Sequence, residues 1–275
     1  MNIDLSNIKL SKRERNEILK LLNKKKEGLS DLEQTWHFMD LVWDDYDCNS
    51  LDMDSDKIKK FYSHPVWLLN GLFIEQHDLS MSHRHAISDW IINKAFKSVV
   101  DYGGGFGTLA RLIAEKDKNI DVYILEPYPS DFGLRRVRDF QNIKFIKELE
   151  KNYDCLIATD TLEHVSDPLY TFSDMVKSVK KNGYLVTANC FEPVIKCHLP
   201  QHFHFRHSFN MFAEMMGLKV VTNLDNSHAT IFKKLREPSL NWTKIRFYEK
   251  VSKILFPIIE IVKFIFRPLK KFLIK

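Results

Sequence analysis

A short apolar run that ends in a cluster of glycines is the feature that most constrains how this chain folds. A β run at residues 98–101 leads into a loop containing Gly103, Gly105 and Gly107, and a helical pattern follows. Glycines at such a turn let the backbone bend tightly and approach a ligand without a Cβ in the way. The N-terminal N–H groups of the next helix then point at that ligand. The pattern predicts a strand, a ligand-binding loop and a helix in succession.

Strand and helix patterns alternate beyond this loop. Further strands are predicted at residues 121–126, 142–146, 153–159 and 183–188, with a final pair at 218–222 and 228–232. Helices are predicted between them, at residues 109–116, 169–179 and 209–216. Strands that alternate with helices predict an α/β fold, in which a parallel sheet is covered by helices on both faces.

An acidic residue stands at the end of the second predicted strand. Glu126 lies 19 positions past Gly107. A carboxylate at that place can accept hydrogen bonds from both hydroxyls of a ribose. The loop and Glu126 together predict a site for a ribose-bearing cofactor.

Three motifs together resemble those of class I S-adenosylmethionine-dependent methyltransferases. They are the D-x-G-x-G-x-G order from Asp101, the acidic Glu126, and the segment 160–165 after the fourth strand. The similarity covers about residues 90–233. Thr108 stands where the G-x-G-x-x-G pattern of dinucleotide dehydrogenases has its last glycine. The resemblance implies a Rossmann-like seven-stranded sheet with one antiparallel strand, and S-adenosylmethionine as cofactor.

The resemblance also assigns residues to the parts of the cofactor. It places the methionine end beside Asp101 and Gly103, the ribose beside Glu126, and the sulfonium end beside Thr159 and Asp160. The full set that it implies is Asp101, Gly103, Gly105, Gly107, Glu126, Thr159 and Asp160. The implied organisation has three parts: a helical N-terminal cap or substrate region at 1–90, the cofactor-binding methyltransferase domain at 91–235, and a tail at 239–275.

Histidines are the candidates for acid–base chemistry. Methyl transfer mainly requires an acceptor aligned with the methyl group, but an oxygen acceptor also loses a proton, for which histidine is suited. His164 follows the fourth strand at the ligand-binding edge. His202 and His204 lie in a segment predicted to be extended, where both would point to one side. The alternatives are that His164 only holds its loop by hydrogen bonding and that the other two pack.

A divalent cation is an alternative at the same place. Asp160, Glu163 and His164 resemble the Glu-x-x-Glu-His cation site of ubiquinone-pathway and small-RNA O-methyltransferases, and His202 is a possible distal ligand. Such an ion would clamp acceptor hydroxyls as a Lewis acid. The first ligand here is Asp, one methylene shorter than Glu, so the prediction is a site without metal.

The positive charge of the chain is concentrated in its tail. Residues 239–275 hold nine Lys or Arg and two Glu, a net +7, so that the rest of the chain carries about −2. Apolar residues recur every three or four positions from Phe247 to Phe272, and Pro257 and Pro268 are expected to kink or break this helix. A basic amphipathic helix favours an anionic membrane surface as partner over nucleic acid. The alternative is packing on the protein itself or on a second subunit.

The composition of the chain indicates where in the cell the protein is expected. Four cysteines without a C-x-x-C pair are too few for a disulfide scaffold. The basic N-terminal segment has no apolar stretch behind it, unlike a secretory signal, and no uncharged run approaches the ~18–20 residues of a membrane span. These features predict a cytoplasmic protein that is peripheral on the inner face of the membrane.

The predicted function is methyl transfer from S-adenosylmethionine to a hydroxyl of a sugar, a glycan or another small acceptor. Polysaccharide biosynthesis is the expected setting, because the tail suggests an acceptor made at the membrane. A quinone or lipid O-methyltransferase, with or without a metal, is the first alternative. The second is a methyltransferase fold that has lost catalysis and serves as a membrane scaffold.

Overall fold

The computed structural model describes residues 3, 5, 6, 8–53 and 55–272, and only the backbone of 267–272. Its helices are α1 (Lys12–Leu22), α2 (Asp31–Asp45), α3 (Asp56–Tyr62), α4 (Val66–Gln76), α5 (Asp78–Ile92), α6 (Thr108–Lys116), α7 (Asp131–Val137), α8 (Pro168–Ser178), α9 (Phe205–Met215) and α10 (Trp242–Phe272). Its strands are β1 (Ser98–Tyr102), β2 (Asp121–Leu125), β3 (Ile143–Ile146), β4 (Tyr153–Thr159), β5 (Val179–Ala188), β6 (Leu218–Asn223) and β7 (Thr230–Lys234).

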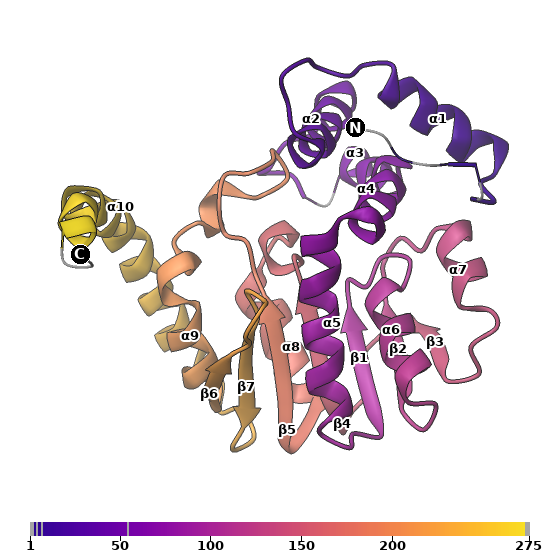
Figure 1. Ribbon diagram of the computed structural model, residues 1–275. Helices are drawn as coiled ribbons and strands as arrows, with labels where there is room; N and C mark the ends of the chain where they lie inside the picture. The colour runs from indigo at the N-terminus through magenta and orange to yellow at the C-terminus, as the bar shows by residue number, and fades with distance from the viewer. Residues whose placement is uncertain (1–2, 4, 7, 54, 273–275) are drawn as a thin grey trace.

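The seven strands form one sheet in the order β3-β2-β1-β4-β5-β7-β6 (Figure 1). The first five strands run parallel, and β7 pairs antiparallel with both β5 and β6. The order reverses between β1 and β4, and a ligand is expected above the carboxyl ends of the strands at such a switch point. The predicted α/β class, seven-stranded sheet and antiparallel final pair are confirmed.

Alternating strand residues build a core on each face of the sheet. In β1, Val99 packs with α5 and α6 on one face, whereas Val100 packs with α8 and α9 on the other. Both side chains are fully buried. Successive strand residues point to opposite faces, so a continuous apolar run such as that of β4 satisfies both cores. The sheet is therefore a rigid platform for the loops at its edge.

The N-terminal helices α1 to α4 lie over the carboxyl edge of the sheet (Figure 1). They have a core of their own, which also receives Phe106 from the glycine loop and Ile195 from the loop after β5. Gly71 makes the contact to Phe106 possible, because a Cβ at Gly71 would lie 1.9 Å from the Phe106 ring. The helical N-terminal part is thus packed directly onto the predicted cofactor loop. The domain boundaries predicted from the sequence stay a prediction.

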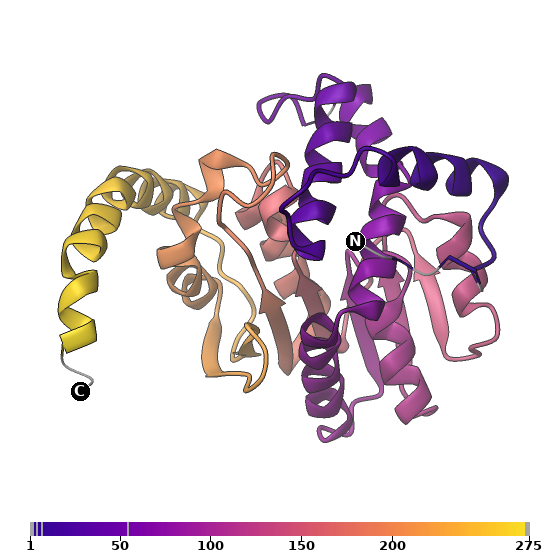
Figure 2. The ribbon, with the colours of Figure 1, turned by 45° about the horizontal axis from the view of Figure 1, so that its top comes forward.

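The prolines of the C-terminal helix do not end it. α10 continues through Pro257 and past Pro268 as one helix, so the helix is not broken there. Figure 2 shows that the helix is curved and leads away from the body. α10 packs on α9, with side-chain hydrogen bonds to α9 from Ser252, Glu260 and Lys263, and Ile245 is buried in the core. No helix among the described residues is long and apolar enough to cross a bilayer. Residues 273–275 of the predicted tail lie outside the described residues.

Candidate functional site

A cleft of about 1030 Å³ opens at the carboxyl edge of the sheet, beneath the N-terminal helices. The loops after β1, β2, β4 and β5 line it together with α4 and α5. Gly103, Gly105, Glu126, Thr159 and Asp160 are among its lining residues. Asp101 lines it as well, whereas Gly107 is the residue before α6 and is not part of the lining. Six of the seven residues predicted to bind the cofactor therefore line one cleft. The seventh, Gly107, belongs to the same loop but does not line the cleft.

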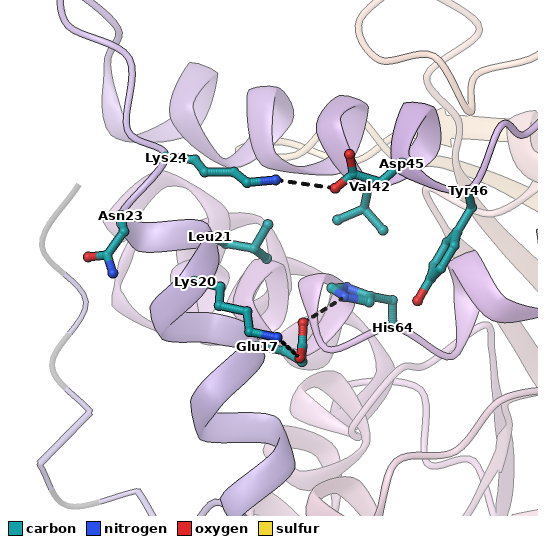
Figure 3. Close-up of a pocket in the computed structure, with 9 residues that line it drawn as sticks. All are labelled: Glu17, Lys20, Leu21, Asn23, Lys24, Val42, Asp45, Tyr46 and His64. Carbon is teal, nitrogen blue, oxygen red and sulfur yellow. Dashed lines mark hydrogen bonds and ion pairs between the residues drawn. The ribbon is translucent and has the colours of Figure 1, made fainter.

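A second cavity of about 510 Å³ lies between α1 and α2 (Figure 3). Its charged side chains pair with one another. Lys24 Nζ lies 3.3 Å from Asp45, and Glu17 accepts a 2.7 Å bond from Lys20 and lies 3.7 Å from His64 Nε2. Figure 3 shows that the Lys24–Asp45 and Glu17–His64 pairs connect the α1 segment to α2 and to the turn before α4, whereas Lys20 and Glu17 pair along α1. The residues predicted to bind the cofactor line the larger cleft instead.

Glu126 ties the glycine loop to the end of β2. Its two carboxylate oxygens accept the backbone N–H groups of Gly105, at 3.0 Å, and Tyr128, at 3.1 Å. Burial raises the pKa of Glu126, although these two bonds oppose the shift. Gly105 has φ +56°, and a Cβ there would meet nothing within 4 Å. The loop thus holds an open space beside a fixed carboxylate, which fits a ribose.

Asp101 and Arg84 form a charged end of the cleft. Asp101 Oδ2 is buried without a hydrogen-bond partner among the described residues. Burial raises the pKa of Asp101 to about 7, against the opposing charge of Arg84. Arg84 lines the cleft from α5, and its guanidinium Nη1 donates a hydrogen bond to the Ser80 carbonyl at 3.0 Å. An unsatisfied carboxylate beside a guanidinium suits the ammonium and carboxylate of an amino acid.

Arg84 was not predicted as a site residue. It lies in a polar run, residues 77–85, whose sequence is compatible with a pocket wall or with a loop and a helix N-cap at Ser82. The structure shows a wall made by a helix: α5 starts at Asp78, and five residues of the run, on its first two turns or just before it, line the cleft. These residues are His77, Leu79, Ser80, His83 and Arg84.

Glu163, His164 and His198 meet at the other end of the cleft. Their nearest ligand atoms all lie within 4.8 Å of one another. His164 Nδ1 lies 3.1 Å from the Cys197 carbonyl, and His198 Nδ1 lies 2.7 Å from the Glu192 carbonyl. Because a carbonyl only accepts, each Nδ1 carries the proton and each Nε2 keeps its lone pair.

The carboxylate of this cluster is buried and half satisfied. Glu163 Oε1 accepts the Cys190 N–H at 2.8 Å, and Oε2 has no partner within the part of the chain that the structure describes. Burial raises the pKa of Glu163 to about 8 and lowers that of His164 to about 3. Asp160, the first ligand suggested by the sequence, turns away to His228, whose Nε2 lies 3.5 Å from it. The distal histidine of the cluster is His198, not His202.

The structure does not bring His202 or His204 to the cleft. Residues 200–202 form a 3₁₀ turn and α9 follows at Phe205, so the predicted extended geometry is wrong. His202 Nε2 bonds the Val165 carbonyl at 2.9 Å, and His204 Nδ1 bonds Ser252 of α10 at 2.8 Å. Both side chains are buried. Of the three histidines predicted to be catalytic, only His164 lines the cleft.

Aromatic rings form the wall between the N-terminal helices and His164. Tyr62 stacks on Trp67 at 5.2 Å and on Tyr128 at 6.0 Å between ring centroids. The Tyr62 and Trp67 rings are nearly perpendicular to the His164 ring, with distances of 6.3 and 5.7 Å between ring centroids. The apolar lining continues into the N-terminal helices and the loop after β5 through Leu32, Trp36, Met39, Met53, Ile58, Leu68, Val194 and Ile195. This half of the cleft suits a flat apolar ligand.

Comparisons with known proteins agree with this geometry. Residues 75–233, more than half of the chain, match the family described as methyltransferase domain. A ubiquinone biosynthesis O-methyltransferase of Saccharophagus degradans is 28% identical over 144 residues, which are 48% of this chain and 61% of that protein. One of Aliivibrio fischeri is 26% identical over 148 residues, 49% of this chain and 62% of that protein. The chain thus spans about three fifths of these relatives.

One solved structure shares the fold over a larger part of the chain. It is an O-methyltransferase from neocarzinostatin biosynthesis, in complex with S-adenosylmethionine and 2-hydroxy-5-methyl naphthoic acid. The TM-score is 0.55 at 12% identity, and the match covers 76% of this chain and 74% of that chain. The family match covers more than half of the chain and agrees with the topology of the sheet: the chain belongs to the methyltransferase domain family.

Proposed function

We propose that this protein transfers the methyl group of S-adenosylmethionine to a hydroxyl of a small, largely apolar ring-bearing acceptor. The aromatic and apolar half of the cleft carries this proposal, because it ends at His164, beside the loop after β4. The acceptor class corresponds to the quinone or lipid alternative drawn from the sequence. Relatives named ubiquinone biosynthesis O-methyltransferases are consistent with it.

The charged half of the cleft is the proposed cofactor site. Asp101 receives the ammonium of the methionine part, Arg84 receives its carboxylate, and Glu126 holds the ribose. Thr159 and Asp160, at the end of β4, line the sulfonium end. The bound cofactor supplies a methyl group on a positively charged sulfur, and the chain's main task is to align an acceptor oxygen with it.

His164 is the proposed acceptor contact. Its Nδ1 proton is engaged by the Cys197 carbonyl, so the Nε2 lone pair is available to accept from a hydroxyl. The ring is held between Tyr62, Trp67 and His198, which fixes its orientation. An acceptor ring stacked in the aromatic wall, such as a catechol, would donate one hydroxyl to His164 and leave the neighbouring hydroxyl for methyl transfer.

Two features of the sequence point to a sugar or glycan acceptor: the basic tail and, as additional support, the histidine segment 202–207. Since His202 and His204 lie away from the cleft, that support is lost, and glycan chemistry becomes an outcome for the assay to decide. The inactive-scaffold alternative conflicts with an intact glycine loop, a partnered Glu126 and an open cleft.

A panel of acceptors with radiolabelled S-adenosylmethionine tests the proposal. We expect a prenylated catechol and a simple catechol to be methylated with kcat/KM at least about tenfold above that of a nucleotide sugar, because only the former match an apolar wall. Analysis of the products is expected to show a methyl ether. A preference for the nucleotide sugar would contradict the proposed acceptor class and restore the glycan hypothesis.

The C-terminal helix is the proposed membrane contact, at the cytoplasmic face. Large apolar side chains on α10 are exposed, with Ile254, Ile258 and Ile261 at 69%, 55% and 60% of their surface. Basic residues accompany them, giving the segment 239–275 its charge of +7. Such a helix lies in the interface, with its apolar face in the acyl boundary and Lys or Arg near anionic headgroups. An apolar acceptor dissolved in a membrane would be reached from there.

A metal-assisted variant of this function is favoured by the cluster of Glu163, His164 and His198. Each of the three residues offers a ligand atom within 4.8 Å of the other two, and Glu163 Oε2 has no partner among the described residues, which fits a divalent cation. The Nδ1–carbonyl bonds are the support that metal-bound imidazoles usually have. These three residues would hold the ion, and a bound ion would polarise a catechol hydroxyl.

Calorimetric titration of the full-length protein with Zn²⁺ and Mn²⁺ separates the two variants. The metal-assisted variant predicts binding at one site per chain that weakens at least about tenfold in Glu163→Gln and in His198→Ala, because each substitution removes one ligand. His85, an exposed histidine of α5 outside this cluster, gives the matched control His85→Ala, which is expected to bind as the parent does. Binding that is equal in all four proteins would exclude this cluster as the cation site.

A further inference from the structure

A histidine–aspartate pair closes the side of the cleft formed by β6 and β7. His228 lies in the loop between these strands, and its Nε2 is 3.5 Å from Asp160 Oδ1. Both residues line the cleft and are about half exposed, at 46% and 47% of their side-chain surface. Because β7 runs antiparallel to β5, the loop before it returns to the carboxyl edge of the sheet. The topology thus brings a residue from the last strand pair to the first residue after β4.

The pair is set among groups from α5. The His83 ring lies 5.2 Å from the His228 ring, nearly perpendicular to it, and Arg84 follows His83 on the same helix. The hydrogen bond to Asp160 raises the pKa of His228 above its usual value, while burial and the charge of Arg84 oppose the shift. The Asp160 carboxylate therefore stabilises the protonated form of His228, whereas the Arg84 guanidinium destabilises it.

The pair also lies where the reacting sulfur is expected under the proposed function. Glu126 holds the ribose at the β2 end of the cleft, and Asp101 with Arg84 holds the amino-acid part over β1. The sulfonium links these parts and must lie between them and the end of β4. Asp160 is the residue that follows β4 there, and His228 is in contact with it.

We propose that the Asp160–His228 pair accepts the proton that the acceptor hydroxyl loses during methyl transfer. In this step the bond from sulfur to the methyl carbon breaks, and its electron pair stays on sulfur. The acceptor oxygen forms the new bond to carbon, and its proton passes to Nδ1 of His228, since Nε2 faces Asp160. One positive charge leaves the sulfur and one appears on the imidazole, so the charge of the site is conserved. Asp160 orients the ring and stabilises its protonated form.

The proposal predicts that protonation of His228 is linked to the relative affinity for S-adenosylmethionine and S-adenosylhomocysteine. A positive sulfonium near His228 disfavours the imidazolium, whereas the neutral thioether of S-adenosylhomocysteine does not. By reciprocity, loss of the His228 proton strengthens S-adenosylmethionine binding relative to S-adenosylhomocysteine binding. The affinity ratio of cofactor to product must therefore rise with pH as His228 titrates.

Nuclear magnetic resonance of the full chain labelled at its 11 histidines measures the first half of this linkage. The His228 signal is assigned by its loss in His228→Asn. Between about pH 5.5 and about pH 8, we expect the pKa of His228 to be about one unit lower with S-adenosylmethionine than with S-adenosylhomocysteine, a tenfold change in proton affinity. Equal pKa values in the two complexes would overturn the proposal.

Calorimetry over the same pH range measures the second half. The ratio of S-adenosylmethionine to S-adenosylhomocysteine affinity is expected to rise about tenfold in the parent and to stay constant in His228→Asn. His85, an exposed histidine of α5 outside the cleft, supplies the control His85→Asn, which should follow the parent. A rise that persists in His228→Asn would assign the linkage to another group and reject the pair. Failure of both ligands to bind at any pH would instead overturn the proposed function itself.

Discussion

Replacing Gly105 with arginine is expected to abolish S-adenosylmethionine binding, with a loss of affinity of at least about a hundredfold, while the fold is retained. Gly105 has φ +56°, where a residue with a Cβ is strained by roughly 1–2 kcal/mol. A Cβ there meets nothing within 4 Å, so the arginine does not disturb the packed core. Its side chain instead occupies the cleft beside Glu126, where we place the ribose. Calorimetry with S-adenosylmethionine and circular dichroism check the two halves of this prediction.

Gly28 provides a matched control for this substitution. It has φ +82° and also leaves open space around a Cβ, but it lies between α1 and α2, outside the cleft. Gly28→Arg therefore carries a similar backbone strain and the same added charge. We expect it to bind S-adenosylmethionine as the parent does. Equal affinities of Gly105→Arg and Gly28→Arg would show that the glycine loop does not cradle the cofactor.

Replacing Ile254, Ile258 and Ile261 together with aspartate is expected to release the protein from anionic vesicles. Each exposed isoleucine buried in a membrane contributes about 2 kcal/mol, and each aspartate adds repulsion from the lipid headgroups. The combined loss predicts at least about a hundredfold weaker binding in a sedimentation assay with phosphatidylserine-containing vesicles. Because the three side chains are exposed, the substitutions leave the core intact.

Three exposed apolar residues elsewhere supply the control for the helix. Leu51, Leu134 and Val221 lie outside α10, and their replacement by aspartate adds the same negative charge. That variant should remain bound to vesicles, apart from a small effect of net charge. Undiminished vesicle binding by the α10 variant would contradict the membrane proposal. A change in oligomeric state on substitution of α10 would instead support the alternative of a second subunit.

Local patterns in the sequence predicted residues that lie together in the part of the cleft where we propose that the cofactor binds. Asp101, Gly105 and Glu126 lie within one strand–loop–helix–strand unit, so their spacing along the chain fixes their positions in space. The alternation of strand and helix patterns likewise predicted a sheet covered by helices on both faces. The fold class followed from these units, because strands separated by helices leave few other topologies.

The remaining site residues depend on distant segments that the fold brings together. Arg84 comes from a helix before β1, and His228 from the hairpin after α9. Neither position carries a local signal of its role. The prediction that His202 and His204 point to the same side is wrong, because side chains alternate with a period of two only in extended segments. This segment forms helical turns instead. Pro200, which favours the first position of a helix, was the available signal.

Calorimetric titration of the full-length protein with S-adenosylmethionine and S-adenosylhomocysteine tests the central claim most directly. The structure predicts that each ligand binds at one site per chain with micromolar affinity, because an open cleft joins an unpartnered Asp101, Arg84 and a fixed Glu126. Binding of neither ligand, by a protein shown to be folded, would contradict the cofactor assignment and leave the scaffold alternative in its place.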